Sequence, residues 1–455
     1  MVTISGAGGG SGQGAGRGAE AAGSTALLTD HYELTMLQAA LRSGAAHRRS
    51  VFEVFARRLP DGRRYGVVAG TGRVLEAIAG FRFGEAQLAF LERTAVVDRP
   101  TLDWLADYRF RGTVHGYAEG ECYFPQSPIL QVEGTFAEAV LLETVVLSVL
   151  NHDSAIAAAA SRMTSAAAGR PCIEMGSRRT HEQAAVASAR AAYLAGFAST
   201  SNLEAGFRYG VPTVGTSAHA FTLVHDSERE AFQTQVSTLG KGTTLLVDTY
   251  DVAEAVRAAV EVAGPDLGAI RLDSGDLLWM AHRVRKQLDE LGARGTRIVV
   301  TSDLDEYAIA ALAVAPVDAY GVGTQLVIGS GAPTASMVYK LVARADSARD
   351  GASMVPVEKR APDKPSRGGR KYAYRRIDGD GVATAEVVGL GEPPADLAGR
   401  GRNLITPLLV DGEPVEQPSL ERSRELHRRS VAELPISATQ LSRGDAVIPT
   451  VYEHA

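Results

Sequence analysis

The stretch TTLLVDTYDVAEAVRAAVEVAGPDLGAIRLDSGD (residues 243–276) contains two short apolar runs separated by a helical pattern. The two runs, at 243–250 and 268–276, are mostly apolar and end in polar residues, as buried strands do. Between them, apolar residues recur at helical spacing through DVAEAVRAAVEVAG (251–264). A strand, a helix and a second strand in this order predict parallel strands covered by a helix.

Strand-like and helix-like segments continue to alternate over most of the middle of the chain. The further strand-like runs are PCIEMG (171–176), FASTSN (197–202), VPTVGT (211–216), TRIVVTSD (296–303) and VDAYGVGT (317–324). Because so many strand–helix units follow one another, the pattern favours an α/β barrel over a doubly wound sheet. We place this barrel domain at residues 149–342.

The segments on either side of the barrel have other patterns. Residues 1–23 are rich in Gly, Ala and Ser, and we expect them to form a disordered tail. Residues 24–148 begin with a helical pattern and continue with SVFEVFARRLP (50–60), which alternates as a strand does. Residues 343–455 are rich in Pro, Gly and charge, and include the strongly basic stretch 359–376. We expect this last segment to be rich in β-strands and to pack on the N-terminal domain.

The composition argues against several classes of protein. The 455 residues carry a net charge of −6 and are 45% hydrophobic, so the chain has material for a large core and no general attraction to polyanions. No apolar run approaches the roughly 18 residues of a membrane span, and the N-terminus lacks the apolar region of a secretory signal. The two cysteines, Cys122 and Cys172, have no metal-ligand spacing. We therefore expect a cytoplasmic protein without disulfides.

Nearly every strand-like run of the barrel ends in polar residues. In a barrel these strand ends meet on one face, which is where barrel enzymes have their active sites. The arrangement therefore predicts an enzyme. The residues, in chain order, are Arg178, Arg179, Thr200, Ser201, Asn202, Thr216, His219, Asp248, Asp251, Arg271, Asp273, Ser274, Asp276, Thr301, Ser302, Asp303, Asp305, Gly321, Gly323 and Thr324.

Several of these groups indicate phosphate or sugar chemistry, although each also has a structural interpretation. In GTSAHAF (215–221), hydroxyls and backbone N–H groups suit a phosphate and the imidazole is able to accept one, unless it is a core histidine. RLDSGDL (271–277) offers a cation and two carboxylates, which fit sugar hydroxyls and a metal-bound polyphosphate. The glycines of GVGT (321–324) suit a phosphate cradle. Arg178 and Arg179 form either an anion clamp or a solvated helix start, and aspartates after a strand are often N-caps.

Taken together, these segments resemble the nicotinate phosphoribosyltransferase family. The matching pieces run in order from Ser24 to the basic stretch, so the resemblance covers most of the chain, and their order and spacing are far more specific than any single piece. They are TDHYELTM (29–36), FEVFARRLP (52–60), EMGSRR (174–179), TSN (200–202), GTSAHAF (215–221), RLDSGDL (271–277), GVGT (321–324) and YKLV (339–342).

The resemblance implies a fold and a reaction. The implied fold is an incomplete, TIM-like α/β barrel joined to an αβ sandwich domain built from both chain ends, in a homodimer with shared active sites. The implied reaction joins nicotinate to 5-phosphoribosyl 1-pyrophosphate, giving nicotinate mononucleotide and pyrophosphate in the salvage route to NAD, and is driven by ATP hydrolysis. Mg²⁺ is the implied metal. No nucleic acid or membrane partner is implied.

The resemblance also implies roles for individual residues. The family's phosphorylated histidine falls on His219, and Arg271 and Asp273 complete the catalytic group. Substrate contacts fall on Tyr32, Arg178, Ser201, Thr216, Arg271, Gly323 and Thr324. From their own chemistry, the carboxylates of Asp273 and Asp276 are the candidates to hold Mg²⁺ near the departing pyrophosphate. One departure is Met175, which stands where the family usually places an aromatic residue against the pyridine ring.

The choice between nicotinate and nicotinamide depends on charge. The nicotinamide-using relatives carry an aspartate that accepts the amide N–H, whereas this sequence has Ser201 at the matching place. A neutral hydroxyl does not repel a carboxylate, so Ser201 favours nicotinate.

Other functions stay open at this point. Nicotinamide or quinolinate phosphoribosyltransferase is the nearest alternative. A barrel isomerase or lyase that binds a sugar phosphate at residues 321–324 is a second, and a nucleic-acid binder that uses the basic stretch 359–376 is a third.

Overall fold

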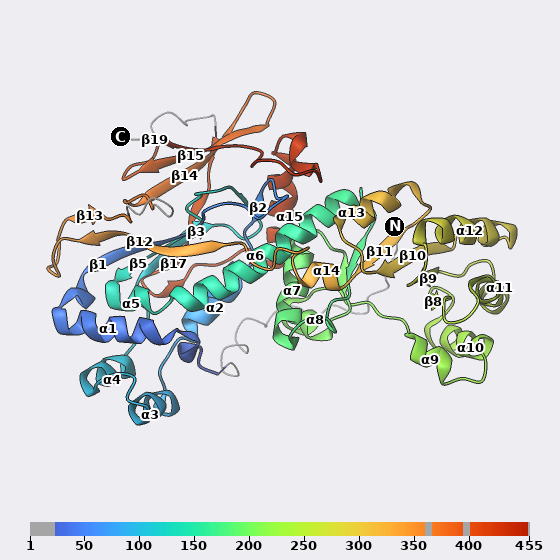
Figure 1. Ribbon diagram of the computed structural model, residues 1–455, viewed down its shortest axis with the longest axis horizontal. Helices are drawn as coiled ribbons and strands as arrows, with labels where there is room; N and C mark the ends of the chain where they lie inside the picture. Colours follow the sequence, from blue (N-terminus) through green and yellow to red (C-terminus); the bar gives the residue numbers. More distant parts are fainter. Residues whose placement is uncertain (1–22, 360–365, 395–400, 454–455) are drawn as a thin grey trace.

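Two large β-sheets organise the molecule, for which a computed structural model describes residues 23–359, 366–394 and 401–453. An antiparallel sheet and a parallel sheet lie toward opposite ends of the long axis, and the helix α6 (Glu143–Ala166) runs between them (Figure 1). The predicted disordered tail lies outside the described residues except for Gly23, and so does part of the basic stretch, residues 360–365.

The antiparallel sheet combines strands from both ends of the chain. Its order is β13-β12-β1-β5-β3-β17-β18. The bounds are β13 (Met354–Pro356), β12 (Met337–Ala345), β1 (Arg49–Ala56), β5 (Leu130–Thr135), β3 (Thr113–Tyr117), β17 (Ile405–Val410) and β18 (Glu413–Pro414). Helices α1 (His31–Ser43) and α5 (Phe136–Val140) lie on one side of this sheet, and a four-stranded sheet lies on the other (Figure 1).

The four-stranded sheet explains why β1 is buried on both faces. Its order is β16-β14-β15-β19, with bounds β16 (Gly401–Asn403), β14 (Lys371–Ile377), β15 (Ala383–Leu390) and β19 (Thr450–Glu453). Alternation in 50–60 predicts an exposed polar face, yet Glu53 is only 2% exposed and pairs with Lys371 Nζ at 2.7 Å. The C-terminal segment therefore covers this face, and two basic residues of β14, Lys371 and Arg375, are buried.

The barrel domain contains six parallel strands in the order β7-β6-β11-β10-β9-β8. The bounds are β6 (Cys172–Glu174), β7 (Ser199–Thr200), β8 (Thr244–Leu246), β9 (Ala269–Leu272), β10 (Arg297–Ser302) and β11 (Ala319–Val322). No pairing closes β8 onto β7 among the described residues, so the curled sheet is an incomplete barrel. The predicted fold class is thereby confirmed.

The prediction of a strand at residues 211–216 is wrong. This segment is extended but makes only one isolated bridge, between Thr213 and Thr200. Pro212 has no N–H to give to a ladder, and Gly215 interrupts the segment three residues later. The segment instead crosses the open side of the barrel as a loop, which leads into α9 (His219–Leu223).

The other helices are mostly short and cover the sheets. In the N-terminal part they are α2 (Thr71–Ala79), α3 (Glu85–Arg93) and α4 (Arg99–Ala106). Around and after the barrel they are α7 (Glu182–Leu194), α8 (Leu203–Tyr209), α10 (Glu228–Leu239), α11 (Val252–Ala263), α12 (Leu277–Glu290), α13 (Glu306–Ala311), α14 (Thr324–Val327) and α15 (Leu420–Ala432). A minor sheet joins β2 (Gly66–Val67) to β4 (Cys122–Tyr123), and single 3-10 turns are η1 (Ala26–Leu28), η2 (Ala45–His47), η3 (Leu312–Val314) and η4 (Ile436–Thr439). Within the described ranges, no helix has the length and apolar character needed to cross a bilayer.

Candidate active site

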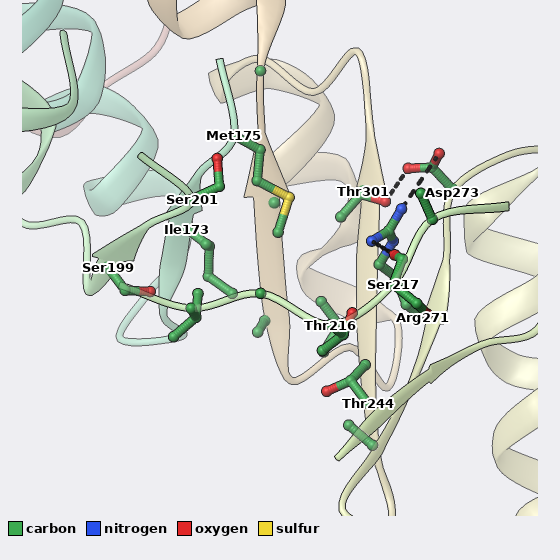
Figure 2. A pocket seen from close by; sticks show the side chains of 18 of the residues that line it. Ile173, Met175, Ser199, Ser201, Thr216, Ser217, Thr244, Arg271, Asp273 and Thr301 are labelled. Carbon is green, nitrogen blue, oxygen red and sulfur yellow. Dashed lines mark hydrogen bonds and ion pairs between the residues drawn. The ribbon is translucent and has the colours of Figure 1, made fainter. Parts of the chain in front are cut away.

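A cavity of about 1140 Å³ occupies the inside of the incomplete barrel. Side chains from every strand of the parallel sheet and from the loop 211–218 line it (Figure 2). The cavity brings together most of the predicted site residues, namely Arg178, Ser201, Thr216, Arg271, Asp273, Gly323 and Thr324. Its volume slightly exceeds the roughly 300–1,000 Å³ of small-molecule sites, so it has room for more than one substrate.

Small side chains keep the interior of the barrel open. Residues two apart on a strand point to the same face, and Ala269, Ala319, Gly321, Ser199 and Thr244 all line the cavity. In ordinary α/β barrels this interior is packed with bulky branched residues. The cavity is therefore a consequence of the sequence of the strands and not only of the loops.

Arg271 and Asp273 lie side by side at the end of β9. Arg271 Nη2 is 3.8 Å from Asp273 Oδ2, and Arg271 Nη1 donates to the carbonyl of Ser217 at 3.4 Å (Figure 2). Asp273 also accepts a hydrogen bond from the Thr301 hydroxyl on β10. The Nε of Arg271 is buried without a hydrogen-bond partner among the described residues. This guanidinium is thus held in place with a donor still available for an anion.

His219 is the first residue of α9 and stands beside this pair. Its Nδ1 is 3.1 Å from the Thr249 hydroxyl, and its Nε2 is 3.9 Å from Asp273 Oδ2. The side chain is 40% exposed, so it is not a core histidine. Because α9 starts at His219, Thr216 lies before the helix, and the two residues do not share a helical face.

Asp248, at the end of β8, supports the loop that carries Asp273. One carboxylate oxygen accepts from the backbone N–H of Asp273 at 2.9 Å and from the hydroxyl of Ser274 at 2.7 Å. The other oxygen, Oδ1, is buried with no hydrogen-bond partner among the described residues. A buried carboxylate oxygen without a donor is what a cation site requires.

The loops after β6 and β7 carry Arg178 and Ser201, and Glu174 ties these loops together. Glu174 is completely buried and accepts hydrogen bonds from the backbone N–H of Gly176 and from the hydroxyl of Thr200. Burial raises the pKa of Glu174, while these two hydrogen bonds act in the opposite direction. The backbone N–H of Ser201 also donates to the Glu174 carbonyl at 2.8 Å.

Met175 and the residues of β11 form a second wall of the cavity. A Cβ atom added to Gly321 would lie 2.8 Å from Met175 sulfur and 2.4 Å from Thr301 Cγ2, so only glycine leaves the present packing intact. Gly323 precedes α14 and Thr324 begins it, which places both at the cavity wall. Met175 therefore takes part in the lining, as expected from its position in the sequence (Figure 2).

The loop 211–218 is anchored by a residue that was not predicted. The hydroxyl of Ser217 donates to Gln235 Oε1 at 2.9 Å, and Gln235 Nε2 donates to the Thr244 carbonyl at 2.9 Å. Gln235 is only 5% exposed although it lies on the amphipathic helix α10. No sequence signal distinguishes it from a surface glutamine, whereas Glu174 is detectable as the one acid in an otherwise apolar strand.

Three predicted site residues are not among those that line the cavity: His219, which stands beside Asp273, and Asp276 and Tyr32. Asp276 caps α12, where its side chain accepts from the backbone N–H of Trp279 at 3.0 Å. Tyr32 lies on α1, whereas α9 with His219 lies near the other end of the long axis (Figure 1). Within this chain Tyr32 is therefore not brought to the barrel. Among the described residues, no group of three or more His, Cys, Asp or Glu side chains is arranged to hold a metal ion.

Comparisons with known proteins agree with this geometry. Residues 27–151 match the family model of the nicotinate phosphoribosyltransferase (NAPRTase) N-terminal domain. The nicotinate phosphoribosyltransferase pncB1 of Mycobacterium tuberculosis is 58% identical over 432 residues, which cover 93% of this chain and 94% of that protein. The nicotinate phosphoribosyltransferase of Bacillus subtilis is 36% identical over 366 residues, which cover 78% and 74%.

A solved structure extends the comparison to the fold. The crystal structure of human nicotinic acid phosphoribosyltransferase superposes with a TM-score of 0.78 at 27% sequence identity, and the match covers 94% of this chain and 97% of the human one. The match thus spans both the barrel and the domain built from the two chain ends. From the identities and coverage together, this chain belongs to the nicotinate phosphoribosyltransferase family.

Proposed function

We propose that this protein joins nicotinate to 5-phosphoribosyl 1-pyrophosphate and couples the reaction to ATP hydrolysis. The observation that best supports the proposal is a group beside the cavity, in which Asp273 Oδ2 lies 3.8 Å from Arg271 Nη2 and 3.9 Å from Nε2 of His219, a residue from a different segment of the chain. This group combines an anion-binding cation, a carboxylate and an open imidazole, beside a cavity large enough for two substrates.

In the proposed reaction the bond between ribose C1 and the pyrophosphate oxygen breaks, and a bond from the pyridine nitrogen to C1 forms. The leaving pyrophosphate takes the electron pair of the broken bond. The pyridine nitrogen is a neutral nucleophile, so the site needs to position the ring and does not need a base. Arg271 and Arg178, which line the cavity, are the groups that would bind the carboxylate and phosphate charges.

Mg²⁺ fits the carboxylates at this end of the cavity. Asp273 is accessible, and Asp248, which follows β8 and binds the loop of Asp273, has a buried oxygen, Oδ1, without a donor among the described residues. Protein sites often hold Mg²⁺ through one or two carboxylates and complete its shell with substrate phosphates and water. Asp273 would therefore hold the ion, Asp276 would contribute only if it left its capping position, and the ion would neutralise pyrophosphate charge.

His219 would accept the γ-phosphoryl group of ATP. The P–O bond to ADP breaks and a P–N bond to the imidazole forms, and water later hydrolyses the phosphohistidine to inorganic phosphate. Thr249 contacts Nδ1, which leaves Nε2 directed toward Asp273 and the substrates. Nε2 is accordingly the nitrogen that we expect to be phosphorylated.

The site favours nicotinate over nicotinamide because Ser201, and not an acid, lines the cavity after β7. A neutral hydroxyl leaves the attraction between the substrate carboxylate and Arg178 unopposed. The free, buried cysteines Cys122 and Cys172 fit a reducing compartment, which supports a cytoplasmic location.

A homodimer with shared sites would bring Tyr32 to the substrates. Tyr32 is 45% exposed at the start of α1, and Met36 on the same helical face is 37% exposed. Burial and the nearby Glu143 raise the pKa of Tyr32 to about 12, so its hydroxyl stays protonated. Since the barrel of the same chain lies toward the other end of the molecule, the partner subunit's barrel is the one that Tyr32 would enter.

Pyrophosphate release is the measurement that tests the function. Assays would contain 5-phosphoribosyl 1-pyrophosphate and Mg²⁺ with nicotinate, nicotinamide or quinolinate, each with and without ATP. We expect release with nicotinate and strong enhancement by ATP. ATP-independent release with quinolinate, or release with nicotinamide alone, would overturn the substrate assignment.

The His219→Ala variant tests the coupling. It should lose the enhancement by ATP and retain slow transfer, because the transfer chemistry itself does not pass through the imidazole. His282→Ala, an exposed histidine on α12, is the matched control. Unchanged ATP dependence in a folded His219→Ala protein would contradict the phosphohistidine.

A further inference from the structure

Loop 211–218 spans the open side of the barrel. The sheet has β7 and β8 as its two edge strands, and these strands do not pair with each other among the described residues. At the start of the loop, a backbone N–H donates to the Thr200 carbonyl of β7 at 2.9 Å. At its end, the Ser217 hydroxyl donates to Gln235, and Gln235 in turn donates to the carbonyl of Thr244, the first residue of β8. The loop is thus tied to both edges of the sheet, and Gln235 makes the link to β8.

Ser217 holds the second half of this loop. Of residues 215–218, within the described part of the chain, only Ser217 forms hydrogen bonds with segments other than α9. Its side chain binds Gln235 on α10, and its carbonyl accepts from Nη1 of Arg271 on β9 at 3.4 Å (Figure 2). Residues 215–218 also line the cavity. The position of this part of the cavity wall therefore depends on the contact between Ser217 and Gln235.

The hydrogen bonds of Gln235 suit a neutral amide. The Thr244 carbonyl, 2.9 Å from Nε2, only accepts, so the NH₂ group faces β8 and Oε1 accepts from Ser217. Nε2 also donates to the Thr243 hydroxyl at 3.1 Å. The side chain is only 5% exposed, and its three partners carry no charge. Water has little access to replace a lost partner, so an unmet donor or acceptor here is costly.

The Ser217 carbonyl is one of two contacts that orient Arg271. Nη1 donates to this carbonyl, and Nη2 lies 3.8 Å from Asp273 Oδ2. The guanidinium is planar and rigid, so the loss of one contact lets all of its N–H groups turn together. Its Nε, which is buried without a hydrogen-bond partner among the described residues, would then change direction as well. A shift of Ser217 therefore reaches the group that we assign to anion binding.

We propose that Gln235 is a positioning residue for nicotinate binding, because it holds Ser217, and through it the Arg271 guanidinium, in the orientation that meets the substrate carboxylate. Gln235 does not line the cavity, so it acts only through the loop. Its loss should weaken substrate binding and leave the chemical step nearly unchanged, which raises KM more than it lowers kcat. That the ligand is nicotinate rests on the proposed function.

Gln235→Glu tests the hydrogen-bond pattern, because the new carboxyl changes its donors with pH. When protonated it accepts from Ser217 and donates to the Thr244 carbonyl as the amide does, and when ionised it has no donor. Burial raises the pKa of a carboxyl, which brings this change into the range of an assay. The KM for nicotinate, relative to the wild type at the same pH, should be raised about tenfold near pH 8 and return toward the wild type near pH 5.5. Gln233→Glu, an exposed position on the same helix, is the matched control and should show no such trend.

Gln235→Leu and Ser217→Ala remove the same contact from its two sides. Each should raise the KM for nicotinate at every pH. Because Gln235 acts through Ser217, the double variant should be little worse than either single variant. Thermal unfolding shows which variants are folded, and Ser217→Ala keeps the test valid if the leucine variant is not.

Hydrogen exchange of residues 215–219 follows the loop without turnover. Relative to the wild type at the same pH, exchange should accelerate in Gln235→Leu, and in Gln235→Glu it should accelerate only at the higher pH. Unchanged exchange, a wild-type KM in Gln235→Glu near pH 8, or strictly additive effects of Gln235→Leu and Ser217→Ala would each overturn the positioning role.

Calorimetric titration with nicotinate separates this role from the proposed function. A wild type that releases no pyrophosphate would refute that function, and the titration then decides the role of Gln235 by itself. About tenfold weaker binding to folded Gln235→Leu supports the role, and equal binding overturns it. A wild type that does not bind nicotinate at all overturns both.

Discussion

Glu174 shows how one buried residue determines the position of others that meet the substrate. Both of its carboxylate oxygens accept hydrogen bonds, one from Gly176 and one from Thr200, and these donors begin the loops that carry Arg178 and Ser201. No cation contacts it among the described residues. Its carboxylate is stabilised by donors at the ends of two strands, so one side chain fixes the positions of both loops relative to each other.

Glu174→Gln should raise the KM for nicotinate by about 10–100-fold and change kcat much less, because the amide presents N–H to a site that holds two donors, at a cost of about 1–3 kcal/mol. Steady-state kinetics of pyrophosphate release measure both parameters. Glu182→Gln, an exposed acid at the start of α7, is the control. An unchanged KM in Glu174→Gln would show that the loops keep their positions without this carboxylate.

Glu228, the first residue of α10, makes stability depend on pH. Burial and the neighbouring Asp248, Asp251 and Glu254 raise its pKa to about 7. The folded state then holds more protons than the unfolded state between about pH 4.5 and 7, so this residue lowers stability as the pH rises through that window.

Replacing Glu228 by Gln should therefore raise the melting temperature at pH 8 and leave it nearly unchanged at pH 5. Scanning calorimetry across this range measures the difference. Glu290→Gln, which alters an exposed acid on α12, should give no such trend. A melting temperature of Glu228→Gln that stays parallel to the wild type would contradict the assignment.

At the scale of elements, His427 holds α15 against the core. It is buried, its Nδ1 lies 3.1 Å from the Gly120 carbonyl and its Nε2 lies 3.0 Å from the Ser161 hydroxyl. Since a carbonyl only accepts, Nδ1 donates to Gly120, and in the neutral ring Nε2 accepts from the Ser161 hydroxyl. Burial lowers the pKa of His427 to about 4.

The unfolded state therefore binds one more proton than the folded state between about pH 4 and 6.5, and stability is lost as the pH falls through this window. The loss due to His427 is on the order of 3 kcal/mol. His427→Asn keeps a donor for Gly120 and does not titrate. In urea unfolding from pH 4 to 7, the wild type should lose stability relative to His427→Asn, and a constant difference would rule out this role. His282→Asn controls for an exposed histidine.

Elements also show what the sequence could and could not predict. Residues 268–276 were predicted as a strand with a polar end because apolar runs and terminal charges are local features. Residues 211–216 have the same appearance but make only one bridge. Regular pairing with a neighbouring strand needs N–H groups along the segment, and Pro212 has none. The burial of Glu53 could not be predicted, because alternation within a strand says nothing of a second sheet that covers its polar face. The role of Gln235 was not predictable for the same reason, because its partners Ser217 and Thr244 lie elsewhere in the sequence.

At the scale of the whole molecule, α1, which carries Tyr32, and α9, which begins with His219, lie toward opposite ends of the long axis (Figure 1). Mixing Tyr32→Ala and His219→Ala subunits should restore activity if each site takes Tyr32 from the partner. One site of each mixed dimer is then intact, which gives about a quarter of wild-type activity after random exchange. Mixed samples that show only the sum of the parental activities would place Tyr32 in its own subunit or outside the site.

The antiparallel sheet has a consequence for biosynthesis. β1 leaves the ribosome early, but its neighbour β12 follows almost 300 residues later, and β3 waits still longer for β17. The parallel strands between them are complete first, so the barrel is able to form while the early strands β1, β5 and β3, which pair with one another, still lack β12 and β17 at their two edges. Such long-range pairing is slow and leaves strand edges open to wrong association. A nascent chain of this protein therefore has unpaired strand edges for most of its synthesis. Chaperones should bind it most strongly until residues 401–453 emerge from the ribosome.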